Sequence, residues 1–112
     1  MITVGLDFGT HQSKVCAEYK QGVELSYTFF TFPDTTGKHQ YTLPSIIHRR
    51  PDGRMDYGYI PANSNGEIIR YFKQATFTTS SIGLKQADAM YYSVWYLAFI
   101  IFDLEEKYGT EF

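Results

Sequence analysis

The stretch VGLDFGTHQSKV, residues 4–15, decides how the chain begins to fold. Apolar residues stand at every second position from Ile2 to Phe8, with small or polar residues between them, which is the period-two pattern of a β-strand. Gly9 interrupts the pattern, and a second alternating run follows over residues 14–20. We therefore expect two strands that are joined by a sharp turn at Gly9.

Further strands are predicted downstream of this pair. Gln21 and Gly22 form a turn signal before a third alternating run over residues 23–29, so the first three runs predict an antiparallel meander. Asp52-Gly53 separates two more β-type runs and predicts a hairpin. Residues 67–72 fit a helix as well as a strand, and residues 76–83 are predicted to be a connector.

The period changes to that of a helix from about residue 84. Gly109 stands where a helix commonly ends, and Lys107 suits the negative end of the helix dipole. One apolar face is expected to comprise Val94, Leu97, Ala98, Ile101, Leu104 and Tyr108. A second apolar stripe comprises Tyr91, Trp95, Phe99 and Phe102. Since the predicted sheet can cover only one side of the helix, the second stripe indicates that a partner or further chain covers it.

The expected fold class is therefore α+β, with about five strands in an antiparallel meander and hairpins, followed by one long C-terminal helix. The 112 residues suffice for one small domain. We divide that domain into a meander over residues 1–32, a hairpin and connectors over 33–83, and the helix over 84–109.

Composition excludes several classes of function. The net charge is −2, and the basic cluster at residues 48–50 is interpreted as a solvated strand end, so we expect no nucleic-acid partner. The longest apolar run covers residues 94–102, which is too short to cross a membrane. No secretory signal precedes the first strand, and the single cysteine fits a reducing compartment, so we expect a cytoplasmic protein.

The residues with the clearest chemistry lie at the first turn. The strand would deliver Asp7 at its end, and Gly9 would leave room for backbone N–H groups to converge on phosphate oxygens. Thr10 adds a hydroxyl donor, and the Asp7 carboxylate suits Mg²⁺. Asp-Phe-Gly is also the magnesium motif of protein kinases, but only six residues precede it here. Because Asp-x-Gly-Thr is also a common turn string, the residues alone leave a purely structural role open.

The segment resembles the first phosphate motif of the actin-like ATPase superfamily, whose lobes have a ribonuclease H-like fold. Residues 43–47, LPSII, followed by the Asp52-Gly53 turn, resemble the heat-shock protein 70 branch of that superfamily. Tyr71-Phe72-Lys73 is similar to the place where those chaperones carry a catalytic lysine, and residues 95–109 are similar to their first long helix.

The resemblance implies an ATP/ADP site with Mg²⁺. Asp7 would hold the metal and act in catalysis, and Lys73 would position or polarise the attacking water. Gly9, Thr10, His11 and Gln12 would bind the phosphates. His11 and Gln12 depart from the family pattern, as does the sequence that follows Lys73, and the residues also allow Lys73 to be a surface lysine in a connector.

A second phosphate turn and an adenosine-binding strand, which the superfamily places further along the chain, are absent from the sequence. We therefore expect the N-terminal portion of an ATP-binding domain, which does not hydrolyse ATP alone. Its expected partners are the nucleotide and either the remainder of its own ATPase domain or another protein. A homodimer through residues 91–108 is also expected. The alternative is a stand-alone interaction or assembly module that uses the aromatic helix and has no nucleotide chemistry.

Overall fold

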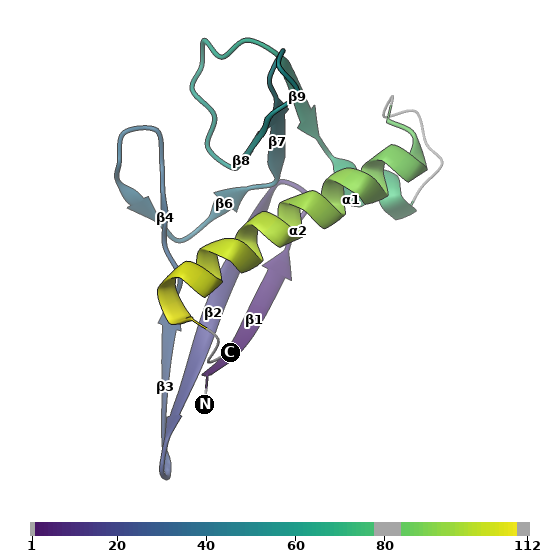
Figure 1. Ribbon diagram of the computed structural model, residues 1–112. Helices are drawn as coiled ribbons and strands as arrows, with labels where there is room; N and C mark the ends of the chain where they lie inside the picture. Colours follow the sequence, from purple (N-terminus) through teal and green to yellow (C-terminus); the bar gives the residue numbers. More distant parts are fainter. Residues whose placement is uncertain (1, 78–83, 110–112) are drawn as a thin grey trace.

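The computed structural model describes residues 2–77 and 84–109 (Figure 1). The strands and helices in chain order are β1 (Ile2–Phe8), β2 (Gln12–Gln21), β3 (Glu24–Phe29), β4 (Phe32–Pro33), β5 (His39–Gln40), β6 (Leu43–Pro44), β7 (Ile46–Arg49), β8 (Met55–Tyr57), β9 (Glu67–Arg70), α1 (Phe72–Phe77) and α2 (Gln86–Tyr108). The α+β class with antiparallel sheets and a C-terminal helix is confirmed.

The strands form three small sheets. β1, β2 and β3 form the predicted antiparallel meander, and β6 adds to β2. β4 pairs with β5, and β7 pairs with both β8 and β9. The prediction of about five strands is therefore wrong in number, because the described residues contain nine. β4 and β6 are two-residue strands that end at Pro33 and Pro44, where proline offers no N–H to extend a ladder.

The ambiguous segment before the helix resolves into two elements. Residues 67–70 form β9, and α1 begins at Phe72. Of the predicted connector, Thr76 and Phe77 complete α1, and residues 78–83 lie outside the described part of the chain.

Helix α2 ends as predicted, but its buried face differs from the predicted one. Gly109 has a φ of 65°, and its N–H donates to the Glu105 carbonyl. The buried residues are Ala89, Tyr92, Ser93, Tyr96, Ile100, Leu104 and Tyr108. The predicted face is confirmed at Leu104 and Tyr108, and Leu97 packs against the core while partly buried, but Val94 and Ile101 are exposed. α2 carries apolar residues around most of its circumference, so apolar periodicity could not identify the side that meets the sheet.

Two apolar surfaces remain uncovered by the described chain. The predicted second stripe of α2 is exposed at Tyr91, Trp95 and Phe102, whereas Phe99 stacks on Tyr57. On β3, Leu25, Tyr27 and Phe29 are exposed. Their partners in the β2–β3 register are Lys20, Glu18 and Cys16, so they share the sheet face that points away from the buried Val15 and Ala17.

A basic cluster was expected to lie at a solvated strand end, and this holds only in part. Arg49 and Arg50 are exposed, but His48 is buried and lies between the Asp56 carboxylate and the Asn65 carbonyl. Arg50 donates twice to Asp56. The cluster therefore ties β7 to β8 and to the loop before β9. No helix within the described residues has the length and apolar character that crossing a membrane requires.

The β4–β5 turn leads to a prediction about acid stability. The Asp34 carboxylate accepts bonds from the Thr36 hydroxyl, the Gln40 amide, and the Thr36 and Lys38 N–H groups. These bonds lower the pKa of Asp34 to about 2, and the bond from the Thr36 hydroxyl has the largest effect. A carboxylate whose pKa is lower in the folded state stabilises the fold above its unfolded pKa of about 4, and this stabilisation is lost as the pH falls toward 2.

We expect Asp34→Asn to speed amide exchange at Thr36 and Lys38 at neutral pH. The difference from the unchanged protein should shrink as the pH falls from 4 to 2, which hydrogen exchange followed by NMR can measure. A difference that stays constant over this range would show that the charge of Asp34 does not stabilise the turn.

Candidate functional site

The β1–β2 turn is anchored by an aromatic cluster. Phe8, the last residue of β1, stacks on Phe72 and Tyr96 with ring centroids 6.0 and 5.6 Å apart. Phe72 and Tyr96 are fully buried, and the Tyr96 hydroxyl donates to the Leu43 carbonyl. The start of α1 and the middle of α2 therefore fix the position at which β1 ends.

Gly9 is required by space rather than by its φ angle, because it is not among the glycines with positive φ. A Cβ atom added at Gly9 would lie 2.2 Å from the Gln12 carbonyl oxygen, a distance that no side chain can occupy. The chain therefore reverses within four residues because position 9 has no side chain.

Two carbonyl groups of the turn are paired within the protein. The Ser45 hydroxyl donates to the Gly9 carbonyl at 2.7 Å, and the Ser45 N–H donates to the His11 carbonyl at 2.9 Å. Within residues 2–77 and 84–109, the N–H groups of Thr10 and His11 have no hydrogen-bond partner. The carbonyl groups of Gly9 and His11 are thus paired within the protein, whereas the N–H groups of Thr10 and His11 are not, and successive backbone N–H groups of this kind can bind an anion.

Lys73 comes to this turn from α1. Its ammonium group donates to the Phe8 carbonyl at 2.5 Å and lies 5.6 Å from the centre of the Phe8 ring. The side chain is half-buried and belongs to a helix, so it is not a surface lysine in a connector. A positive charge therefore stands at the end of β1, where the turn begins.

Tyr71 lies between β9 and α1 and contacts the β1–β2 turn. Its φ is 61°, the only positive value among the described residues other than glycine, and its ring meets the His11 ring edge-on at 5.5 Å. This positive φ is a strained backbone conformation for a tyrosine. It changes the direction of the chain between β9 and α1, so that Lys73 reaches the turn.

Asp7 lies at the base of the turn on the other face of the sheet. Its side chain is exposed, its register partner is Lys14, and Phe8 points to the opposite face. The described residues contain no group of three or more metal-ligating side chains. A single carboxylate still fits Mg²⁺, which keeps several waters and takes other oxygens from phosphates.

The structure therefore brings five of the six predicted site residues to one turn. These are Gly9, Thr10, His11, Gln12 and Lys73, while Asp7 stands one residue before them on the opposite face. Sequence reasoning missed Ser45 and Tyr71. The LPSII motif, residues 43–47, was a signal for Ser45, but nothing in the sequence marked the strained backbone of Tyr71.

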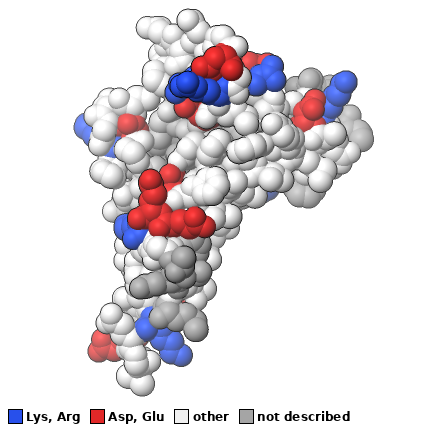
Figure 2. Space-filling model, viewed as in Figure 1, with Lys and Arg blue, Asp and Glu red and all other residues white. Residues whose placement is uncertain are grey.

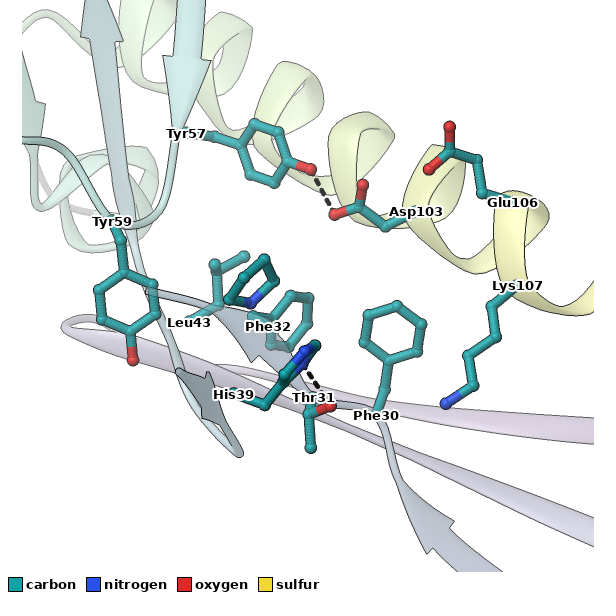
Figure 3. A pocket seen from close by; sticks show the side chains of 11 residues that line it. Phe30, Thr31, Phe32, His39, Leu43, Tyr57, Tyr59, Asp103, Glu106 and Lys107 are labelled. Atoms are coloured by element: carbon teal, nitrogen blue, oxygen red, sulfur yellow. Dashed lines mark hydrogen bonds between the residues drawn. The ribbon is translucent and has the colours of Figure 1, made fainter. Parts of the chain in front are cut away.

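A separate cavity of about 540 Å³ lies between α2, β8 and the β4–β5 hairpin (Figure 3). It contains none of the predicted site residues. The Tyr57 hydroxyl donates to Asp103, burial raises the pKa of that carboxyl, and the Tyr59 hydroxyl donates to the Thr42 carbonyl. Since Tyr57, Asp103 and Tyr59 are already paired within the protein, the cavity offers weaker grounds for a site than the β1–β2 turn does.

Comparisons with known proteins give no indication of the function of this chain. No protein-family model matches this chain, and neither a curated protein nor a solved structure matches it.

Proposed function

We propose that this chain is the N-terminal portion of an ATP-binding domain similar to those of heat-shock protein 70 and actin-like ATPases. In this proposal it contributes the first phosphate hairpin of a partial ribonuclease H-like lobe. The observation that carries the proposal is the β1–β2 turn, where the N–H groups of Thr10 and His11 have no partner among the described residues and the ammonium group of Lys73 bonds to the carbonyl of Phe8, two residues before Thr10.

Each part of the turn has a chemical role in this proposal. The N–H groups of Thr10 and His11, with the Thr10 hydroxyl and Gln12, would hold phosphate oxygens of ATP or ADP. Lys73 would add positive charge where negative charge develops during phosphoryl transfer. Asp7 would hold Mg²⁺ through water, and the metal would neutralise part of the phosphate charge when bound.

The hairpin supplies only one side of a phosphate clamp. In-line phosphoryl transfer requires groups that position the phosphate and the attacking water from both sides. The proposal therefore assigns nucleotide contacts to this chain, and it assigns hydrolysis to a longer protein that contains the second side.

The proposal predicts weak but localised binding of phosphates. Adding Mg²⁺-ATP to the ¹⁵N-labelled chain should shift the amide signals of Thr10, His11 and Gln12, because their N–H groups acquire acceptors. Tripolyphosphate should reproduce the shifts and adenosine should not. Phosphate release should stay at the level of buffer.

Three variants sharpen this experiment. Lys73→Gln should weaken binding, whereas Lys20→Gln, which removes an exposed charge at the far end of β2, should not. Asp7→Asn should remove the Mg²⁺ dependence and retain the response to tripolyphosphate. Unchanged amide signals at millimolar Mg²⁺-ATP would refute the proposal.

The second candidate function is a protein-interaction or assembly module without nucleotide chemistry. The exposed apolar residues of α2 favour it, because a soluble monomer rarely presents such a contiguous surface to water. Phosphate-dependent shifts at the β1–β2 turn would argue against this candidate as the sole function.

A further inference from the structure

Helix α2 has a second apolar face, which we name the outer face. It comprises Tyr91, Val94, Trp95, Ala98, Ile101 and Phe102. Val94 is 66% exposed, Phe102 is 56% exposed and Tyr91 is 53% exposed. α2 crosses in front of the meander in Figure 1, and the same view in Figure 2 shows an uncharged surface along the middle of the helix, with acidic side chains near its C-terminal end.

The outer face lies opposite the buried one. At about 100° per residue, Ala98 points away from the sheet, whereas Tyr96 and Ile100 on either side of it are fully buried. Tyr91, Val94, Ala98 and Ile101 follow one another at spacings of three and four residues. This spacing is that of a seam at which one helix packs against another.

We infer that the outer face is a dimer interface, in which two copies of the chain pack α2 against α2 in antiparallel orientation. The two-fold axis passes next to Ala98, the small residue at the centre of the face. Small side chains at the centre let two helices approach closely, and a two-fold pair uses the same surface on both copies and closes without leaving it exposed.

The antiparallel orientation follows from which residues of the two copies face each other. With Ala98 at the axis, Val94 faces Phe102 of the second copy and Trp95 faces Ile101. At each end Tyr91 meets Glu105 of the second copy, whose exposed carboxylate can accept a bond from the Tyr91 hydroxyl. A parallel pair would place Glu105 against Glu105 and align the two helix dipoles, which are both unfavourable.

The area of the outer face fits a weak, specific dimer. An aromatic side chain buries 150–250 Å² when it is fully covered, so a half-exposed one leaves roughly 100 Å² to cover. Six exposed side chains in each copy, those of the outer face without Ala98 and with Met90 at its edge, give about 1,200 Å² for the pair, which is at the low end for a biological interface. We therefore expect a dissociation constant in the micromolar range.

Light scattering and sedimentation over a concentration series test the interface. The unchanged chain should pass from monomer to dimer as its concentration rises, and Ala98→Glu should shift the midpoint more than tenfold toward higher concentration. Leu25→Glu is the matched control, because it places a charge on the other exposed apolar surface, on β3, and should leave the midpoint unchanged. The proposal would be overturned if the unchanged chain stayed monomeric at high concentration. It would also be overturned if Leu25→Glu lost the dimer and Ala98→Glu retained it.

Cross-linking tests the orientation on a Cys16→Ser background. Ala98→Cys should form an intermolecular disulfide on mild oxidation. Val94→Cys mixed with Phe102→Cys should form one as well, and neither of these two should do so alone. Cross-linking of Val94→Cys or Phe102→Cys with itself would show a parallel pair and overturn the antiparallel one. The amide titration of the β1–β2 turn does not depend on either outcome, so a failure here is distinguishable from a failure of the proposed function.

Discussion

Replacing Gly9 with valine is expected to abolish phosphate binding at the β1–β2 turn. The added Cβ would lie 2.2 Å from the Gln12 carbonyl oxygen, so the turn must open and its N–H groups can no longer converge. Gly9→Ala introduces the same contact without the branched side chain, and we expect it to cost about 1–3 kcal/mol of stability, as other overpacked substitutions do. Both variants should lose the amide shifts that Mg²⁺-ATP causes.

Gly5→Ala is the matched control for this result. A Cβ at Gly5 meets only the Cys16 carbonyl, at 3.9 Å, which is an ordinary contact. This variant should fold and bind phosphate like the unchanged chain. If Gly9→Ala proved as stable as Gly5→Ala and retained the shifts, the turn would not depend on the missing side chain.

The second large effect is expected from Tyr96→Ala. Tyr96 is fully buried, and its ring lies 5.6 Å from that of Phe8 and 5.4 Å from that of Phe72. Removing a large buried aromatic side chain costs about 3–5 kcal/mol, which is a large share of the 5–15 kcal/mol that stabilises a typical domain. Urea denaturation should show a transition at much lower urea concentration, or a chain that is already unfolded in buffer.

Tyr96→Phe separates the packing of the ring from its hydrogen bond. It retains the ring and removes the hydroxyl, which donates to the Leu43 carbonyl and also interacts with the Ser13 and Ser45 hydroxyls, and we expect a loss of about 1 kcal/mol. Equal losses in the two variants would show that the hydroxyl, and not the aromatic cluster, holds α2 against the end of β1.

The local parts of the fold could be predicted from the sequence, and the long-range parts could not. Alternation and the turn at Gly22 predicted the meander, and Gly109 predicted the end of α2, because each signal acts within a few residues. The buried side of α2 was missed, because it includes Tyr92, Ser93 and Tyr96, whose polar groups make them weak markers of burial.

The same division holds for the candidate site. Gly9 was predictable, because the close approach that it permits involves a residue only three positions away. The roles of Ser45 and Tyr71 were not, since Ser45 acts on the turn from 36 residues away along the chain and Tyr71 through a backbone angle. A likeness to a known motif suggested Lys73, but its bond to the Phe8 carbonyl depends on how α1 packs.

The separation of these residues along the chain also determines the order in which the site can form during folding. β1 and β2 are adjacent in sequence, so the hairpin needs only a short loop closure and can form early. The side chains that bond to the turn from elsewhere in the chain belong to Ser45 and Lys73, which are 36 and 65 residues away from their partners in the sequence. During synthesis the hairpin is therefore complete well before Ser45 and Lys73 reach it, and the proposed phosphate binding would require α1 to have docked.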